Sequence, residues 1–165
     1  MPETVTEIER LVAIEAIKQL VARRIRLMDT KNWDEYPETH TPDAVLDSFG
    51  NLPGNLQPSS PQGQGVAAGR AAVTAAVRKV VDPLTTAHYA HMAEIEILSP
   101  TTARGVWAME DRLWWRNGDR VETLHGYGHY HETYRRIDGA WLIASRKLTR
   151  IRIDTTPDFF AYRTD

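Results

Sequence analysis

The chain has 165 residues, of which 42% are hydrophobic and 25% charged, as in an ordinary globular domain. This length is enough for one sizeable hydrophobic core and too short for two comfortable ones. The net charge of -2 gives no basic surface for nucleic acid. Because the chain has no cysteine, disulfides, thiolate nucleophiles and cysteine–zinc sites are excluded.

The N-terminal segment, MPETVTEIERL, is acidic and lacks the apolar stretch of a signal peptide. No apolar run in the sequence approaches the roughly 20 residues that span a membrane. We therefore expect a cytoplasmic protein that binds neither membranes nor nucleic acid. We also expect one domain over residues 1–165, with its core at 5–154 and a C-terminal tail at 155–165.

Three helices and one strand are predicted in the first half of the chain. The longest helix has apolar residues spaced by three and four, and Thr6 with Glu9 forms a capping box at its start. The Gly- and Pro-rich segment after the strand is typical of a loop and is suited to act as a lid. The elements are helices at 6–28, 33–40 and 69–81, a strand at 44–49, and the loop at 50–65.

After Asp82-Pro83 the sequence alternates between apolar and polar residues, which predicts four long strands. Their expected ranges are 86–98, 103–115, 121–137 and 140–153. The last turn, Asp138-Gly139, is a strong two-residue hairpin signal. Helices on one face of an antiparallel sheet make an α+β fold. A strongly bent sheet wrapped around a long helix leaves a conical cavity, which is a usual kind of ligand site.

Three histidines lie close together in the stretch HGYGHYHETYRR. His125, His129 and His131 have the same parity, so a strand directs all three to one face. A metal site is one alternative, but a third ligand and a carboxylate are missing from the pattern. We favour an interface in a homo-oligomer, a dimer or a trimer, because this face carries large side chains. No metal is expected.

The opposite face of the same strand presents Gly126, Gly128 and Tyr130, which suggests the wall of a cavity. The two glycines either make room for a ligand or only let the sheet bend. In the preceding strand, three residues of one parity are expected to line the cavity, namely Trp107, Met109 and Asp111. Asp111 is interpreted as a salt-bridge residue at the rim of the cavity, with a second catalytic acid as the alternative.

Asp29 and His88 are the candidates for proton chemistry. A carboxylate that holds an imidazole fixes its tautomer and stabilises the imidazolium that forms, which makes the pair a general base. Their separation in the sequence does not show that they meet. On the residues alone, we favour the simpler interpretation that Asp29 is a carboxylate at a helix end and His88 a histidine of the core or surface.

Several segments carry a family resemblance. RLMDTKNWDEY, followed by TPDAVLDSF, resembles the opening of the SnoaL-like branch of the nuclear transport factor 2-like superfamily. YRRIDGAWLIASRKLTRIRID is similar to the closing hairpin of that branch. With TTAHYAHMAEIEI, the resemblance spans nearly all of residues 5–154. It implies a cystatin-like, cone-shaped α+β barrel in which three N-terminal helices pack on a strongly curved, mainly antiparallel sheet.

Within that branch the chain looks most like scytalone dehydratase, the bile acid dehydratases and the hexachlorocyclohexane dehydrochlorinase. The resemblance implies that Asp29 and His88 form a catalytic dyad in which the histidine is the base. It places a pocket arginine at Arg146 and a basic residue near Arg24. Met28 stands where scytalone dehydratase has a tyrosine, so scytalone itself is not expected as the substrate.

We therefore predict a cofactor-independent, dehydratase-like lyase that removes a proton from an apolar cyclic small molecule. An isomerase or cyclase of the ketosteroid-isomerase or polyketide-cyclase type is an alternative, and so is a binding domain without catalysis. The dyad is Asp29 and His88. The candidate substrate-binding residues are Arg24, Met28, Trp33, Phe49, Trp107, Met109, Asp111, Tyr130 and Arg146.

Overall fold

The computed structural model describes residues 5–47 and 66–163. It contains two α-helices and a six-stranded sheet, so the predicted α+β class is confirmed. The elements are α1 (Glu7–Asp29), β1 (His40–Asp47), β2 (Val66–Ala68), α2 (Arg70–Val81), β3 (Thr85–Ser99), β4 (Thr102–Asn117), β5 (Arg120–Ile137) and β6 (Ala140–Thr155), with 3-10 turns at Tyr36–Thr39 and Phe159–Arg163. The helix expected at 33–40 is only the first of these turns.

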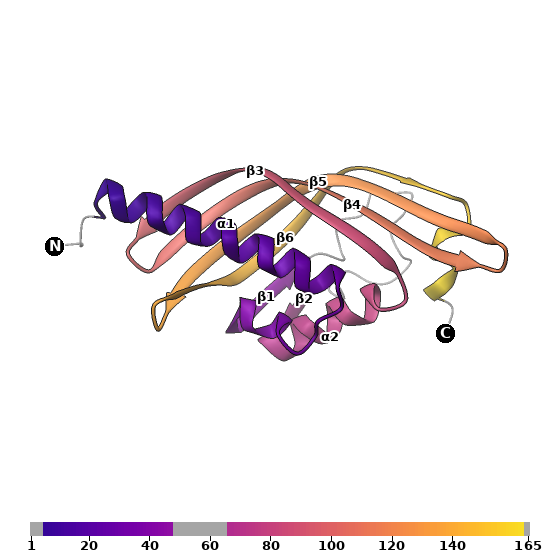
Figure 1. The fold of residues 1–165 in the computed structure, drawn as a ribbon, viewed down its shortest axis with the longest axis horizontal. Coiled ribbons are helices and arrows are strands. Elements are labelled where there is room, and N and C mark those ends of the chain that lie inside the picture. The colour runs from indigo at the N-terminus through magenta and orange to yellow at the C-terminus, as the bar shows by residue number, and fades with distance from the viewer. Residues whose placement is uncertain (1–4, 48–65, 164–165) are drawn as a thin grey trace.

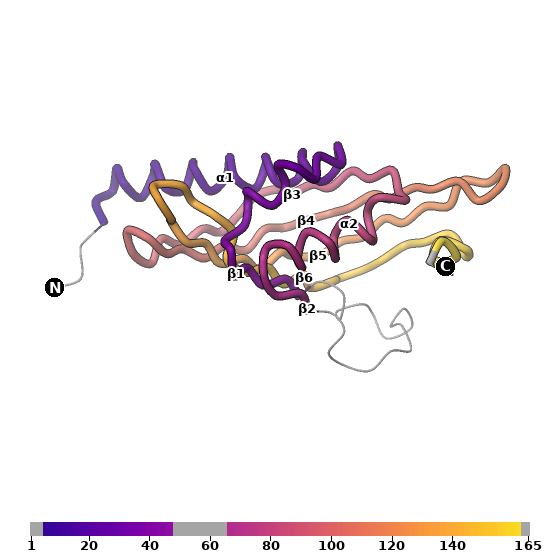
Figure 2. The backbone as a smooth tube through the Cα atoms, turned by 90° about the horizontal axis from the view of Figure 1, so that it is seen from below, coloured from indigo at the N-terminus to yellow at the C-terminus, as the bar shows by residue number. Residues whose placement is uncertain are grey.

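The strands are ordered β2-β1-β6-β5-β4-β3. β1 and β6 run parallel, whereas the other neighbours are antiparallel. α1 runs along one face of the curved sheet, and α2 lies near the C-terminal end of α1 (Figure 1). Seen from below, α1 and the strands form two layers, and the β4–β5 hairpin extends past α2 (Figure 2). A cavity lined by residues of both helices, the sheet and the C-terminal segment lies near this end of α1.

The buried face of α1 differs from the apolar stripe expected from the sequence. Its buried positions are Ala13, Ile17, Val21, Arg24, Leu27 and Met28. Ile8 and Leu11, which belong to the series of apolar residues spaced by three and four, are 74% and 61% exposed. The buried stripe passes through Arg24, a cation that a search for apolar residues skips. The capping box of Thr6 and Glu9 is present as predicted.

The C-terminal segment packs on its own chain. Phe159 is fully buried in a cluster with Leu84, Leu113 and Leu124. The indole Nε1 of Trp115 donates a hydrogen bond of 2.8 Å to the carbonyl oxygen of Phe159. These contacts place the C-terminal segment against β4 and β5 of its own chain. Within the described ranges, no helix is long and apolar enough to cross a membrane.

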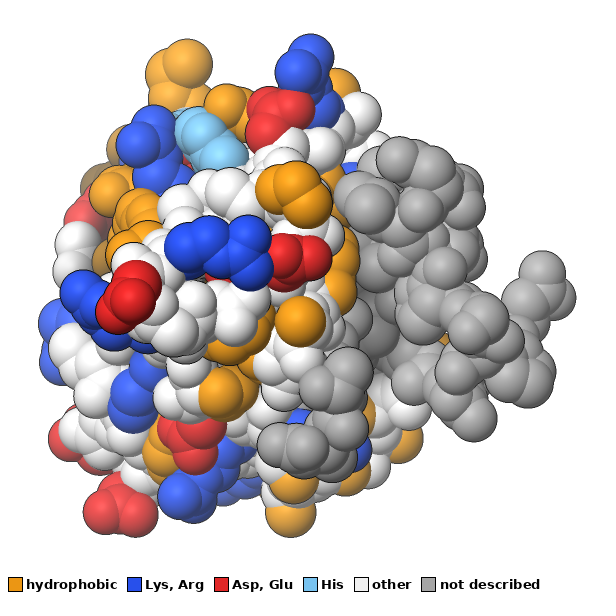
Figure 3. All heavy atoms as spheres, turned by 90° about the vertical axis from the view of Figure 1, so that its right-hand side faces the viewer, with side chains coloured by type: hydrophobic (Ala, Val, Ile, Leu, Met, Phe, Trp, Pro, Cys, Tyr) orange, Lys and Arg blue, Asp and Glu red, His pale blue; other side chains and the backbone are white. Residues whose placement is uncertain are grey.

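The outer face of the sheet carries the three histidines of β5, as the alternation predicted. His125 Nε2 lies 2.7 Å from Glu110 Oε2, and His131 Nε2 lies 3.0 Å from Thr149 Oγ1. In the described part of the chain, no three histidine, aspartate or glutamate side chains are placed to hold a metal ion. Figure 3 views the molecule from the right-hand side of Figure 1, where acidic and basic side chains alternate with hydrophobic ones.

Candidate active site

A cavity of about 170 Å³ lies between α2, the inner face of the sheet and the C-terminal segment. Much of its wall is apolar, with contributions from Met28, Val77, Leu113, Leu124, Leu148 and Phe159. Five polar or charged side chains from the sheet also reach it, namely His88, Asp111, Tyr130, Arg146 and Arg150. An apolar pocket with a few convergent polar groups is the usual form of a site for small molecules.

Asp29 and His88 meet beside this cavity. Asp29 is the last residue of α1, and β3 brings His88 against it. The Nδ1 atom of His88 lies 2.6 Å from Oδ1 of Asp29, and the backbone N–H of His88 donates to Oδ2 at 2.9 Å. Because an ionised carboxylate only accepts hydrogen bonds, Nδ1 must carry the proton. In the neutral imidazole Nε2 then has the lone pair, and His88 is the member of the pair that lines the cavity.

The carboxylate of Asp29 is held in its ionised form. Burial raises the pKa of Asp29. The hydrogen bonds and charge of His88 and the hydroxyl of Thr86 together lower it by more, so the pKa lies below its ordinary value. Thr86 Oγ1 donates to Asp29 Oδ1 at 2.8 Å. An ionised Asp29 can orient the imidazole and stabilise it when it becomes protonated.

An ion pair lies in the wall of the cavity. The two terminal nitrogens of Arg150 each lie 2.7 Å from an oxygen of Asp111. Asp111 is the cross-strand partner of His88 on one side and of Gly126 on the other. A Cβ atom on Gly126 would collide with the side chains of both Arg150 and Asp111. This glycine therefore makes room for an ion pair, a use that differs from both uses expected from the sequence.

The environment of Asp111 corrects one prediction. The expected salt bridge exists, but Asp111 is only 3% exposed and lines the cavity instead of its rim. The reason is the partner, since Arg150 reaches across β5 over a residue that has no side chain. Burial raises the pKa of Asp111, but the Arg150 guanidinium outweighs it and holds the pKa below its ordinary value. Asp111 is therefore unsuited to act as an acid at neutral pH.

Tyr130 lies between two arginines at the end of the cavity nearer α1. The guanidinium carbons of Arg24 and Arg146 lie 5.0 and 5.4 Å from the centroid of its ring. Arg24 is fully buried with Glu132, whose Oε1 is 3.6 Å from Arg24 Nη2. Among the described residues, Nε and Nη1 of the buried Arg146 have no hydrogen-bond partner. Burial raises the pKa of Tyr130, so its phenol remains protonated and can donate a hydrogen bond.

Four of the nine predicted substrate-binding residues line the cavity: Met28, Asp111, Tyr130 and Arg146. Arg24 instead lies against the ring of Tyr130. Trp107 and Met109 point inward as their parity predicted, but they belong to the core between α1 and the sheet. The Nε1 atom of Trp107 donates to the hydroxyl of Tyr134 at 2.7 Å. Both side chains are therefore used in packing.

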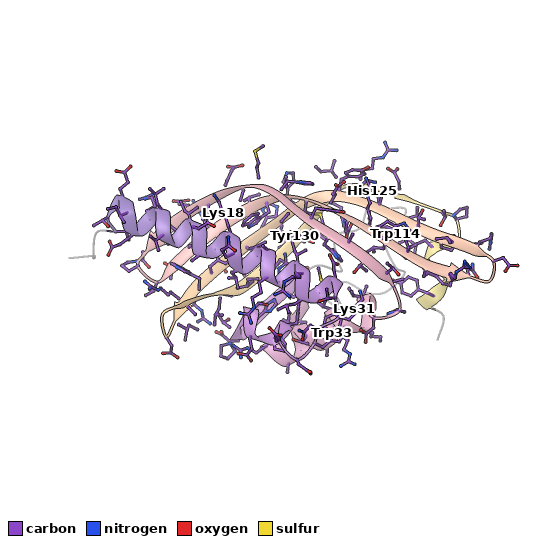
Figure 4. All side chains as sticks on the ribbon, in the orientation of Figure 1. Lys18, Lys31, Trp33, Trp114, His125 and Tyr130 are labelled. Carbon is purple, nitrogen blue, oxygen red and sulfur yellow. The ribbon has the colours of Figure 1, made fainter. Side chains whose placement is uncertain are left out.

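Trp33 and Phe49 are the remaining two predicted substrate-binding residues. Trp33 does not line the cavity, because its Nε1 donates to Asp82 Oδ1 at 2.6 Å and its ring packs edge-on against Tyr36. It lies beside Lys31 beyond the end of α1 (Figure 4). The contact with Asp82 spans 49 residues, so no local pattern reveals it. Phe49 lies outside the described residues, as does the proposed lid at 50–65.

Three residues of the site were not predicted. Arg150 has the same strand parity as Arg146 and lies four residues beyond it, so alternation contained a usable signal. Thr86 has the parity of His88, which likewise indicates a common face. Lys31, whose ammonium lies 2.9 Å from Thr86 Oγ1, has no such signal, because its direction depends on how α1 ends.

Several solved structures are similar to this chain over most of its length. A candidate scytalone dehydratase from Novosphingobium aromaticivorans aligns over 90% of this chain and 91% of its own, with a TM-score of 0.73 and 19% identity. A type 2 hexachlorocyclohexane dehydrochlorinase aligns over 92% and 93%, with a TM-score of 0.74 and 17% identity. A protein of unknown function from Mycobacterium tuberculosis aligns over 91% and 79%, with a TM-score of 0.69 and 20% identity.

These structures share the fold of the chain, and their identities are too low to transfer an activity. The sequence itself matches the SnoaL-like domain family over residues 9–147. This range extends from the first turns of α1 to the middle of β6 and so includes Asp29, His88, Asp111 and Arg146. The chain belongs to the SnoaL-like family, within the nuclear transport factor 2-like fold.

Proposed function

We propose that the protein is a single-domain, cofactor-independent lyase that acts on a mostly apolar small molecule, with a cyclic compound as the expected substrate. The observation that carries this proposal is the 2.6 Å contact between Asp29 and His88 at the wall of the cavity. That contact leaves one imidazole nitrogen free to accept a proton. The size of the cavity and its largely apolar wall favour a small compound with few polar groups.

In the proposed reaction, Nε2 of His88 takes a proton from a carbon atom next to a carbonyl or a leaving group. The electron pair of the broken C–H bond forms the new double bond, and the leaving group departs with its own bonding pair. Asp29 stabilises the imidazolium that results. If hydroxide leaves, it takes the proton from the imidazolium, so that water is released and His88 returns to its neutral form.

The charge of the departing group requires stabilisation, and two side chains can supply it. Arg146 lines the cavity and has unsatisfied buried N–H groups, while the neutral phenol of Tyr130 lies beside it. Fixed donors in a water-poor site stabilise developing negative charge strongly. Asp111 is not assigned a proton-transfer step, because Arg150 keeps it ionised.

The test first measures proton abstraction, because elimination and isomerisation both begin with this step. A panel of cyclic β-hydroxy ketones and chlorinated cyclohexanes is incubated in D₂O, and NMR follows deuterium uptake and product formation. We expect His88→Gln to reduce both by about 10²–10⁴-fold, and Asp29→Asn to reduce them as well. The exposed Asp119, in the turn between β4 and β5, provides a control matched to Asp29→Asn, since Asp119→Asn should leave both rates unchanged.

The outcomes separate the competing functions. Deuterium uptake with loss of water or chloride identifies a lyase, whereas uptake with rearrangement alone identifies an isomerase or cyclase. Binding of the panel compounds without exchange would indicate a binding domain. Wild-type rates in the His88→Gln variant would refute the assignment of this histidine as the base.

We also infer that the chain forms a homo-oligomer through the outer face of the sheet. Tyr89 and Ile151 are 45% and 70% exposed, and the histidines of β5 lie on the same face. A contiguous patch of exposed apolar side chains commonly marks an interface. Light scattering coupled to size-exclusion chromatography would show a dimer or a trimer, and a monomer would contradict the inference.

A further inference from the structure

Lys31 occupies a backbone position that normally favours glycine. The N–H of Asn32 bonds to the carbonyl of Leu27 at 2.9 Å, and the N–H of Lys31 bonds to that of Met28 at 3.1 Å. These two bonds form the Schellman motif that ends many helices, with Lys31 at its left-handed position. The φ angle of Lys31 is 58°. A residue with a side chain is strained there, and such strain is characteristic of functional sites.

The side chain of Lys31 reaches Thr86, which in turn bonds to Asp29. Its Nζ lies 2.9 Å from Thr86 Oγ1, which lies 2.8 Å from Asp29 Oδ1. An ammonium only donates hydrogen bonds and a carboxylate only accepts them. The hydroxyl of Thr86 must therefore accept from Lys31 and donate to Asp29. The direction of both bonds is fixed by the chemistry of their two ends.

We propose that Lys31 is a positioning residue of the candidate active site. Through the hydroxyl of Thr86, its ammonium holds the carboxylate of Asp29 in the orientation that accepts the Nδ1 proton of His88. This role deepens the proposed function, because it concerns the same imidazole base. It also explains why the chain has a lysine at the position where glycine would end α1 without strain.

Several other charged groups lie near Lys31 and the Asp29–His88 pair. The carboxylates near Lys31 are Asp29 and Asp82, and the Asp82 oxygens already accept from Trp33 and Arg78. The titratable side chains that face His88 are Asp29 from α1, Asp111 from β4, Tyr130 from β5, Arg146 and Arg150 from β6, and Tyr162 from the C-terminal segment. The residues of α2 in the cavity wall are valines. Lys31 is thus a cation that acts on Asp29 without lining the cavity.

The expected consequence is a change in how readily the imidazole becomes charged. The ammonium offsets part of the negative charge of Asp29, which reduces the attraction between that carboxylate and an imidazolium. Without the ammonium, protonation of His88 becomes more favourable, and its titration should move to higher pH.

The experiment compares wild type with Lys31→Gly, which removes the ammonium and relieves the backbone strain. NMR of the His88 ring nitrogens gives the midpoint of its titration without any substrate. We expect the midpoint to rise in Lys31→Gly and in Thr86→Val, and to stay near the wild-type value in Lys31→Arg. The melting temperature of Lys31→Gly should equal or exceed that of wild type, because glycine suits the left-handed position.

A merely structural lysine would give the opposite pair of results: a lower melting temperature and an unchanged His88 midpoint in Lys31→Gly. That outcome would overturn the proposal. With an active substrate, the acid limb of the kcat/KM profile of Lys31→Gly should move to higher pH together with the NMR midpoint. Loss of turnover in His88→Gln with an unchanged Lys31→Gly midpoint would refute the role of Lys31 and leave the proposed function standing.

Discussion

The ion pair of Asp111 and Arg150 places two opposite charges in the wall of a small cavity. Their side chains are 5% and 10% exposed, so both charges have lost most of their hydration. A buried ion pair of this kind contributes little compared with apolar residues of the same size. Breaking it is costly, however, because the remaining charge has no partner. At the scale of single residues, the pair therefore determines the polarity of the cavity more than the stability of the fold.

Removing one charge of the Asp111–Arg150 pair should therefore destabilise the protein more than removing both. Asp111→Leu should lower the free energy of unfolding by about 3–5 kcal/mol, because it leaves Arg150 buried without a counter-charge. The double variant Asp111→Leu/Arg150→Leu should recover most of this loss, since neither charge remains. Urea unfolding of the single and double variants measures both values. Equal losses in the two variants would show that the cost lies in packing and not in the uncompensated charge.

The sequence located the inner face of the sheet but not the partners of the residues on it. Alternation correctly directed Asp111 and Tyr130 inward, whereas the partner of Asp111 is 39 positions away on another strand. The approach of Asp29 to His88 is equally non-local, with 59 positions between them. The family resemblance named these two residues, and spacing alone could not. Lys31 escaped prediction because its side chain direction depends on a left-handed backbone angle.

At the scale of elements, the pairing of β5 with β6 contains a β-bulge. Tyr127 pairs with Arg152 and Gly128 with Arg150, so Ile151 has no partner on β5 and is 70% exposed. Such a bulge bends the strand that contains it. Gly128 is required there, because a Cβ atom at this position would collide with the backbone carbonyl of Thr149.

Gly128→Ala should therefore destabilise the protein by about 1–3 kcal/mol, the usual cost of forcing extra atoms into a packed region. The obstruction is backbone, which cannot rotate away. Gly105→Ala in β4 is the matched control, since its Cβ would meet the edge of the Tyr134 ring at 3.3 Å and needs only a small adjustment. Thermal unfolding of the two variants compares them. A Gly128→Ala protein as stable as Gly105→Ala would contradict this view of the bulge.

The elements themselves were predictable to different degrees. The four long strands lie within two residues of their expected ends, because alternation over more than ten residues is a strong signal. The strand β2 was missed, since Val66–Ala68 is too short to show alternation. The second helix did not form, because β1 begins at His40 and leaves only Tyr36–Thr39 for a single turn.

At the scale of the whole molecule, His40 links folding to pH. It begins β1, pairs with Ile143 of β6 and is 2% exposed. Burial lowers its pKa well below 6.5, and the nearby cations Arg146 and Arg24 lower it further. His40 is therefore neutral in the folded protein, with its Nδ1 atom 2.9 Å from Thr39 Oγ1.

The sign of the effect follows from proton binding. Below about pH 6.5 the unfolded chain protonates this histidine, whereas the folded chain does not until its much lower pKa is reached. Stability therefore falls as the pH decreases through this window, by at most about 1.4 kcal/mol per pH unit for one proton. The lowered pKa values of Asp29 and Asp111 act at lower pH, because their stabilisation is present above about pH 4 and is lost below it.

We therefore expect the wild-type protein to lose stability between pH 7.5 and 5.5, and the His40→Gln variant to lose less over the same interval. Urea unfolding at several pH values gives the slope for each protein, so any constant packing cost of the substitution cancels. If His40→Gln and wild type show the same slope, another group is responsible, and the buried histidine where β1 joins the sheet does not control the acid sensitivity of the fold.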